Sequence, residues 1–355
     1  MTARNFTTKR PSVWWPLALV CMCTAQAREV PLPERYRTQI QAVNKDRSAS
    51  VQDRAERIRQ SYLSYFEPYA VGPDLPIEDL QALFDAAYMM AGYTIHHRQS
   101  ESPRYIQRMT QALSALRAAG ADDEANVRKV YAALVASRRF DEARAMIASE
   151  RSLSEERIAP IRVPVRFERD QPGYFDVSEG GEVVLRNVPA PSEGVRILVV
   201  SGCHFARDAA RDITADEALS AAFSRAKALW IAPPDGQFDT DEVRRWNAEF
   251  PTVRLRIAYL TEPWRGIDFS RIPTIYVLRD GAQLAKLTGW SGSESLEQLR
   301  AALRKAELLD DTAAQLREGT DAATVRRVAA QRPALPTAHP DARRGSRAAP
   351  SPPSP

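Results

Sequence analysis

Cys203 is the residue of this chain whose type and setting could carry out chemistry. The chain has three cysteines, and Cys21 and Cys23 lie in an N-terminal segment that we expect to be removed. The remaining thiol follows the strand-like run 195–200 and precedes a helical pattern. At a helix N-terminus it would face unpaired N–H groups and the positive end of the helix dipole, which favour the thiolate that attacks disulfides. The pattern predicts a nucleophilic Cys203; a small buried side chain is the alternative.

His204 is the second candidate catalytic residue, because an imidazolium beside Cys203 would add positive charge. The alternative is an exposed first-turn histidine without a role. No cysteine accompanies Cys203 to build a zinc site, and His96, His97 and His339 lack metal-ligand spacing with partners. We therefore expect no metal and no cofactor.

The pattern around Cys203 alternates between strands and helices. Predicted strands cover 174–177, 182–186, 195–200, 229–232, 253–260, 274–278 and 285–288, and predicted helices cover 203–226, 241–250 and 293–305. Glycines at 180–181 and 281 mark hairpin turns. Such alternation predicts an α/β sheet, with an antiparallel edge formed by the last hairpin.

Residues 28–155 are predicted to be helical. Apolar positions recur at helical spacing in four stripes, and short polar turns between them favour antiparallel packing. One stripe contains Leu80, Leu83, Phe84, Ala87, Tyr88 and Ala91. Residues 130–143 resemble part of a tetratricopeptide repeat, but without a period over several units a plain bundle is the preferred prediction. A linker is expected at about 151–165.

Two segments carry a resemblance to a known fold. Residues 199–206, Val-Val-Ser-Gly-Cys-His-Phe-Ala, resemble the strand-to-helix turn of thioredoxin-fold proteins, and Ile272-Pro273-Thr274, followed by Asp280-Gly281, resembles their proline loop and terminal hairpin. The earlier hairpin at 180–181, and the second strand-helix-strand passage before the proline loop, resemble the TlpA-like periplasmic branch. The resemblance covers residues 165–307.

This resemblance implies a three-layer α/β domain and a cis peptide bond before Pro273. It also implies that Ile272, Pro273 and Thr274 form a peptide-docking edge beside Cys203. Trp264, in the loop before the proline, would either line that groove or act as an ordinary capping aromatic residue.

Ala206 departs from the family pattern, because it stands where the second active-site cysteine would be. A site with one cysteine cannot resolve its own mixed disulfide and needs an outside thiol. A peroxiredoxin is disfavoured because Val200 occupies the position of that family's Thr or Ser. Cluster binding of the monothiol glutaredoxin kind would need a glutathione-binding loop, which the sequence does not show.

The N-terminus predicts a secretory signal over residues 1–27. Arg4, Lys9 and Arg10 precede the short apolar run 13–23, and Ala25-Gln26-Ala27 fits the cleavage pattern. An uncleaved anchor is the alternative, and a lipid attachment at Cys21 is weaker. Cleavage would remove those three basic residues and lower the net charge from +4 to +1. Neither nucleic-acid binding nor membrane attachment after cleavage is expected, and the protein is predicted to be periplasmic.

The sequence thus predicts a signal peptide, a helical domain at 28–155, a thioredoxin-like domain at 165–307 and a disordered tail at 319–355 rich in Ala, Arg, Pro and Ser. Two functions stay open. One is monothiol thiol-disulfide exchange by Cys203, of reductase or isomerase type, on exported proteins. The other is a non-catalytic docking module for a protein partner. A lone thiol also allows a homodimer linked through Cys203.

Overall fold

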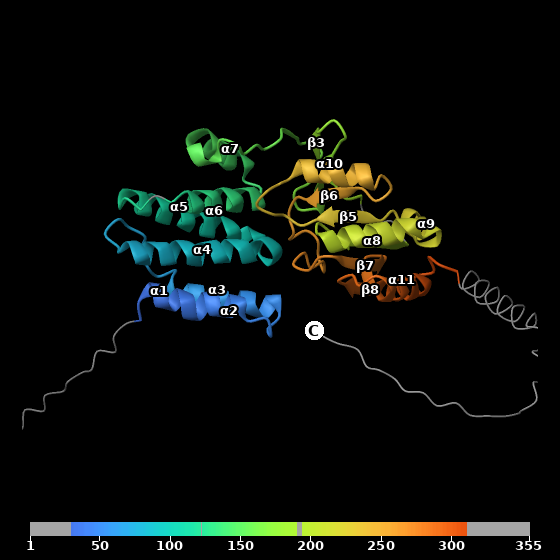
Figure 1. The fold of residues 1–355 in the computed structure, drawn as a ribbon, viewed down its shortest axis with the longest axis horizontal. Helices are drawn as coiled ribbons and strands as arrows, with labels where there is room; N and C mark the ends of the chain where they lie inside the picture. Colours follow the sequence, from blue (N-terminus) through green and yellow to red (C-terminus); the bar gives the residue numbers. More distant parts are fainter. Residues whose placement is uncertain (1–29, 122, 190–193, 311–355) are drawn as a thin grey trace, which may run out of the picture. The chain divides into compact units, whose positions relative to one another are not determined.

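The computed structural model describes residues 30–121, 123–189 and 194–310. The signal segment predicted at 1–27 and the tail predicted at 319–355 lie outside these residues. The chain divides between Glu156 and Arg157 into two compact units (Figure 1). We call residues 30–156 the helical unit and residues 157–310 the sheet unit, and each is described by itself.

All regular elements of the helical unit that the structure describes are helices. They are α1 (Leu32–Arg35), the π-helical turn η1 (Tyr36–Gln41), α2 (Ala42–Lys45), α3 (Val51–Tyr65), α4 (Ile77–His97), the 3₁₀ turn η2 (Gln99–Glu101), α5 (Ser102–Ala118), α6 (Glu124–Ala136), α7 (Phe140–Ser149) and the 3₁₀ turn η3 (Arg151–Leu153). The caps follow the sequence: the Ser50 hydroxyl accepts from Asp53 N, and Asp123 accepts from Ala125 N.

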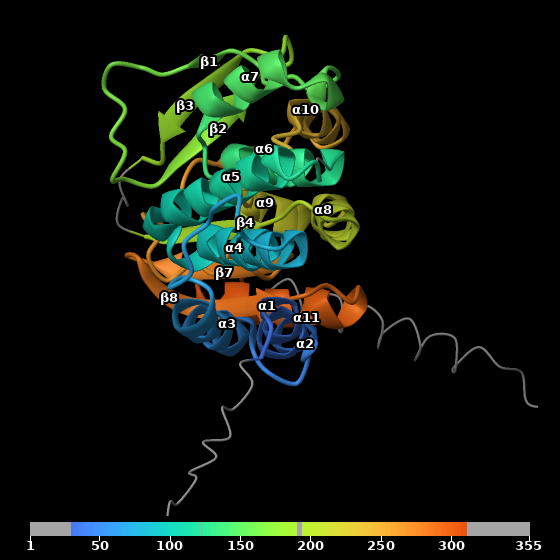
Figure 2. The same cartoon turned by 90° about the vertical axis from the view of Figure 1, so that its left-hand side faces the viewer.

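Helix α4 is the centre of the helical unit. It packs against α3, α5 and α6, and Figures 1 and 2 show it between the α1–α3 group and the α5–α6 pair. Leu80, Phe84 and Ala87 of the predicted stripe are fully buried, whereas Tyr88 is exposed. The ring of Tyr88 is covered by the ammonium of Lys129, 5.4 Å from its centroid. The stripe is confirmed apart from this edge residue.

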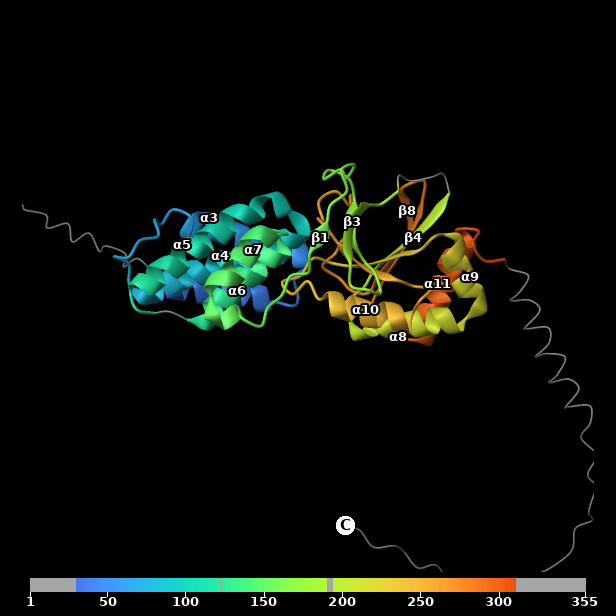
Figure 3. The same ribbon diagram turned by 90° about the horizontal axis from the view of Figure 1, so that it is seen from above.

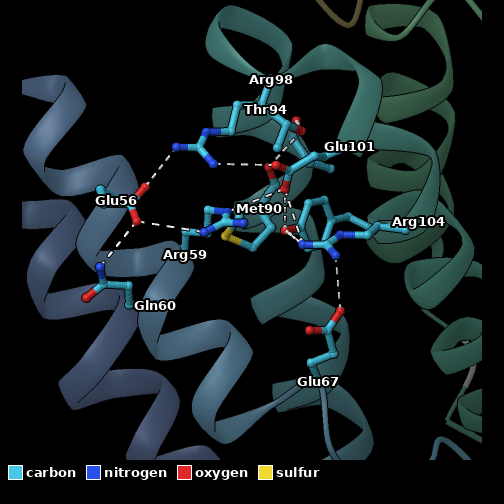
Figure 4. Close-up of polar contacts among 11 residues, drawn as sticks. Glu56, Arg59, Gln60, Glu67, Met90, Thr94, Arg98, Glu101 and Arg104 are labelled. Atoms are coloured by element: carbon cyan, nitrogen blue, oxygen red, sulfur yellow. Dashed lines mark hydrogen bonds and ion pairs between the residues drawn. The ribbon is translucent and has the colours of Figure 1, made fainter.

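Glu101 ties three helices of this unit together (Figure 4). Its carboxylate accepts from Arg59 of α3 at 3.4 Å, and from Arg104 and the Tyr105 hydroxyl of α5, both at 3.2 Å. Arg98, which follows α4, pairs with it at 3.5 Å. Burial works to raise the pKa of Glu101, but Arg59 and Arg104 outweigh it and hold the pKa below its ordinary value.

The segment that resembles a tetratricopeptide repeat spans the end of α6 and the start of α7. Arg138, in the turn between these helices, has a φ of 63°. One helix pair is as compatible with a plain bundle as with a repeat, so this likeness stays a prediction.

The described residues of the sheet unit form eight strands in the order β1-β3-β2-β6-β5-β4-β7-β8. The strands are β1 (Ile161–Arg162), β2 (Gly173–Val177), β3 (Val183–Asn187), β4 (Val195–Val200), β5 (Leu229–Ala232), β6 (Leu255–Ala258), β7 (Thr274–Arg279) and β8 (Ala282–Thr288). Strand β4 runs parallel to β5 and antiparallel to β7. Each predicted strand is present, with ends that differ by up to three residues, whereas β1 was not predicted and lies in the stretch expected to be a linker. This mixed sheet fits a thioredoxin-like α/β domain.

The helices described in the sheet unit are α8 (His204–Ala215), α9 (Glu217–Arg225), α10 (Thr240–Glu249) and α11 (Ser293–Lys305). They lie on one face of the sheet (Figure 3), where the Trp230 ring contacts Phe223 of α9 and Trp246 of α10. On the other face Val200 and Tyr276 pack with Trp264. The expected third layer is therefore made by a loop, because residues 259–273 contain no described helix.

The helix predicted over 203–226 is two helices, so that prediction was wrong at its middle. Asp216 has an extended backbone, with φ −96° and ψ 112°, and its side chain accepts from Leu219 N at the start of α9. Arg300 of α11 binds the same carboxylate at 2.6 Å. Burial alone would raise the pKa of Asp216, but these hydrogen bonds lower it. An Asp that caps a new helix explains the break.

None of the helices in the described residues is long and apolar enough to cross a membrane.

Replacing Glu101 by Gln is expected to destabilise the helical unit by about 1–2 kcal/mol at neutral pH. The amide would no longer form ion pairs with Arg59, Arg98 and Arg104, which would retain their contacts to the more exposed Glu56 and Glu67. Because the pKa of Glu101 is lowered on folding, its contribution is complete above the pKa of the unfolded chain and is lost as pH falls through the folded value. The difference between E101Q and wild type should therefore shrink in acid.

Amide hydrogen exchange of α3–α5 measures this stability separately from the sheet unit. Glu56→Gln is the matched control, since the more exposed Glu56 carboxylate lies at the edge of the cluster, where it pairs with Arg59 and Arg98 and accepts from Gln60. An E101Q effect no larger than the E56Q effect, or one that persists unchanged in acid, would contradict the assignment.

Candidate functional site

The pairing of β4 with β7 brings the two predicted site segments together. Val200, the last residue of β4, lies opposite Thr274, the first residue of β7. The chain leaves β4 into the turn that holds Cys203, and it enters β7 from Ile272 and Pro273. Both segments therefore lie at the end of the sheet where β4 finishes and β7 begins, although they are far apart in the sequence.

The turn before Cys203 is fixed by its backbone. Ser201 is fully buried, and its N–H donates to the carbonyl of Ile231 at 2.8 Å. Gly202 has a φ of 134°, where an added Cβ would be strained; it would lie 3.7 Å from the Cβ of Ala232. This left-handed glycine turns the chain from β4 toward α8.

Cys203 is the N-cap of α8, with an extended backbone at φ −127° and ψ 172°. Its carbonyl accepts from Ala206 N at 3.0 Å and Arg207 N at 3.3 Å, which starts the helix. The thiol is free and partly exposed, and the first turn of α8 contains no acidic residue. The sulfur thus lies at the N-terminal end of a twelve-residue helix, where the unpaired N–H groups and the dipole favour negative charge.

His204 and Phe205 follow at the surface. Both side chains are exposed, and their ring centroids lie 3.9 Å apart with the planes inclined at 39°. His204 directly follows Cys203 in the chain, and its ring packs on the ring of Phe205.

Helix α8 is held on the sheet by polar contacts to neighbouring elements. Arg207, one turn after the cysteine, pairs with Glu242 and Glu249 of α10, and its guanidinium lies 5.4 Å from the centroid of the Trp246 ring. Trp290, just after β8, donates from Nε1 to Asp212 at 2.8 Å. These contacts fix the position of the first turn of α8, and so that of Cys203.

The bond between Ile272 and Pro273 is cis, as the resemblance implies. Pro273 is buried, and its carbonyl accepts from Gly289 N at 2.8 Å. The side chain of Ile272 is exposed. Within the described part of the chain, no residue hydrogen-bonds to the main-chain N–H or C=O of Ile272. These two groups are available to pair with a bound peptide.

Thr274 has a supporting position instead of an exposed one. Its side chain is fully buried, and its hydroxyl donates to the Arg271 carbonyl at 2.8 Å. Its backbone is paired on both sides, opposite Val200 and Thr288. The structure therefore places Cys203, His204 and Ile272 at the surface, with Pro273 and Thr274 beneath it.

Sequence reasoning did not assign Phe205 to the site. The buried face of α8 is formed by Ala206, Ala209, Ala210 and Ile213, and Phe205 does not belong to it. Its helical neighbours at i+3 and i+4 are Asp208 and Ala209, so Phe205 lacks a large apolar partner on its own helix. The absence of such a partner is the sequence feature from which the exposure of Phe205 could have been predicted. Trp264, considered for the groove, lies in the core against Phe269.

No group of three or more His, Cys, Asp or Glu side chains that could hold a metal occurs in residues 30–121, 123–189 and 194–310. The arrangement offers instead a partly exposed thiol at a helix N-terminus, beside a backbone segment with unpaired polar groups. Such a site can bind an extended chain and attack a disulfide within it.

The comparisons with known proteins are sparse. No family model matches the chain, and no curated protein matches it. Among solved structures, a thioredoxin-like protein from Bacteroides caccae is similar, with 14% identity over 84% of this chain and 98% of that chain and a TM-score of 0.27. A similarity at this TM-score carries no weight, so the arrangement of the site rests on the strand register and the local geometry given above.

Proposed function

We propose that this protein is a monothiol thiol-disulfide exchange protein of the thioredoxin-like kind, with Cys203 as the nucleophile. The observation that supports the proposal is the register of β4 against β7, because the segment that leads to Cys203 and the segment that holds Ile272 meet these strands at the same end. A bound chain that pairs with Ile272 would have its disulfide within reach of Cys203.

In the first step the Cys203 thiolate attacks one sulfur of a disulfide in a bound protein. A bond forms between Cys203 and that sulfur, the original disulfide bond breaks, and the other sulfur leaves as a thiolate that takes a proton from water. Cys203 has released its own proton to solvent. Because one disulfide bond forms as another breaks, this step needs no outside oxidant or reductant.

The second step must come from outside the site, because buried Ala206 stands where the family's second cysteine would be. A small-molecule thiol that attacks the Cys203 sulfur would release the bound protein as a dithiol and remain bound to Cys203 as a mixed disulfide. A second small-molecule thiol would then free Cys203 and leave as the small-molecule disulfide. Another cysteine of that protein would instead release it with a rearranged disulfide, which is isomerisation and leaves the total number of disulfides unchanged.

Ala206 also favours a second candidate, a docking module without catalysis. In that case the exposed edge at Ile272 holds a protein partner, and the thiol has no turnover. The two functions differ in the reactivity of Cys203 and share the surface.

We further propose that the protein is exported and acts in an oxidising compartment, where disulfides persist. The support is the sequence pattern of residues 1–27. Expression in a Gram-negative bacterium should give a mature chain beginning at Arg28, as read by N-terminal sequencing. A chain that keeps its first residues would contradict cleavage, and recovery from the cytoplasm would contradict export.

Cys203 should react with iodoacetamide at neutral pH about tenfold faster in the folded chain than in the urea-unfolded chain. The reason is the N-terminal end of α8, which exists only in the folded protein. Mass spectrometry of the mature chain gives both rates, and Cys203→Ser is the blank. A thiol that reacts only after unfolding would rule out exchange and leave the docking module.

Replacing Ala206 by Cys should give the site an internal resolving thiol. The added sulfur would lie one helical turn from Cys203, so glutathione disulfide should oxidise both thiols to an internal disulfide, whereas wild type should stop at a mixed disulfide with glutathione. Mass spectrometry under non-reducing conditions distinguishes the two products. A stable glutathione adduct on A206C would mean that the turn does not have the expected geometry.

A further inference from the structure

The strands β1, β3, β2 and β6 carry arginines on the sheet face that lies away from the helices. Paired residues share a face, so the register places Phe175 and Ile257 together, and both are buried on the helix side (Figure 3). Neighbours along a strand alternate, so Tyr174, Asp176 and Arg256 point to the opposite side. We call this second surface the arginine face; the charged residues of these strands, or directly before β3 and β6, that lie on it are Arg162, Asp176, Glu182, Arg186, Arg254 and Arg256.

Contacts between these side chains confirm that they share a face. Arg186 donates from Nε to Asp176 at 3.1 Å, and Arg254 lies 3.8 Å from the same carboxylate. Arg162 donates from Nε to Glu182 at 2.9 Å. The side chains of Arg162 and Arg186 are 60% and 50% exposed, so these ion pairs can be exchanged for a ligand at little cost. Four arginines against two carboxylates leave the face with a net positive charge.

Arg256 differs from the other three arginines, because it pairs with no carboxylate within residues 30–121, 123–189 and 194–310. Its guanidinium lies 5.3 Å from the centroid of the Tyr174 ring, and Nη1 donates to the Arg254 carbonyl at 3.1 Å. Its Nε is buried and has no hydrogen-bond partner. Since a partly buried charge is costly without a counter-ion, the unused donors of Arg256 indicate an anionic group that binds there.

The pattern of the face favours a protein as the source of that group. Arginine and tyrosine are enriched among the residues that dominate binding at protein interfaces, and Tyr174 lies between Arg186 and Arg256. A uniform polyanion, such as a nucleic acid or an anionic membrane, would be repelled by Asp176 and Glu182. A protein segment can instead place its acidic side chains on the arginines and uncharged ones beside the two carboxylates.

The spacing of two arginines suits an extended segment. Arg254 and Arg256 stand on either side of Leu255, the first residue of β6, so their Cα atoms lie about 7 Å apart. Alternate residues of an extended chain have the same spacing. We propose that the arginine face is a docking surface for a partner protein, which binds through an extended segment with acidic residues at alternate positions, one on Arg256 and the next on Arg254. This surface is independent of the chemistry at Cys203.

The test measures the binding of capped, fluorescently labelled peptides to the mature chain by anisotropy, in buffer of about 20 mM salt. Glu-Thr-Glu-Thr-Glu-Thr should bind about tenfold more tightly than Gln-Thr-Gln-Thr-Gln-Thr, which has the same shape without the charges. Glu-Glu-Glu-Thr-Thr-Thr has the charge without the spacing and should bind about threefold more weakly than the alternating peptide. Equal binding of the alternating acidic and amide peptides, or of the two acidic peptides, would overturn the proposal.

Arg256→Gln should weaken binding of the alternating acidic peptide about tenfold. Arg211→Gln is the matched control, because it removes the same charge from α8, where Arg211 pairs with Asp208 and Glu249. Its affinity should equal that of wild type. Thermal melting shows whether the variants fold; if Arg256→Gln does not, Arg186→Gln at the exposed side of the same face decides, with an expected loss of about threefold. No loss on the face, or an equal loss in Arg211→Gln, contradicts the assignment.

Three further measurements distinguish other occupants. Cys203→Ser should bind the acidic peptide as tightly as wild type, and a weaker affinity would mean that the peptide lies at the thiol. Vesicles of phosphatidylglycerol that sediment with wild type and not with Arg256→Gln would make the ligand a lipid surface. A dimer in sedimentation velocity that Arg256→Gln dissociates would make it a second copy of this chain. Each of these last three results overturns the proposal, and since the peptides contain no cysteine, a failure of exchange at Cys203 does not affect it.

Discussion

The antiparallel pairing of β4 with β7 is the constraint on which the rest of the site depends. Six successive residue pairs, from Val195 with Arg279 to Val200 with Thr274, fix where each strand ends. A slip of one residue would move every side chain of a strand to the opposite face of the sheet, and the side chains buried on both faces of β4 and β7 hold the register against such a slip. Because the register is fixed, the turn at Cys203 and the loop at Pro273 must lie at the same end of β4 and β7.

The helices make that edge rigid. Three side chains of α8 and its C-cap contact distant parts of the sequence: Arg207 contacts α10, Asp212 contacts Trp290, and the C-cap Asp216 contacts Arg300 of α11. Isolated surface ion pairs contribute little to stability. Here they share one helix that also buries its alanine face, so their main effect is to fix where the helix begins. The position of the thiol follows from that starting point.

The chemistry open to such a site is limited by Ala206. With a single sulfur, the protein can form a mixed disulfide but cannot resolve it, so the outcome depends on which thiol arrives next. The same surface can therefore serve a reductase, an isomerase or a holding partner. In each of these proposed roles the unpaired backbone of Ile272 would pair with the bound chain.

The sequence by itself determined the elements and the candidate nucleophile. Strand patterns at 195–200 and 229–232 match β4 and β5 residue for residue, because buried strands are continuous apolar runs, and 293–305 matches α11. Only the tertiary structure decided the break at Asp216, whose carboxylate caps α9 and also binds Arg300 of another helix. It likewise decided that Thr274 is buried and Phe205 exposed, since exposure depends on which distant segments cover a residue. Periodicity is a local property of the chain, whereas the surface around Cys203 is made by residues that only folding brings together.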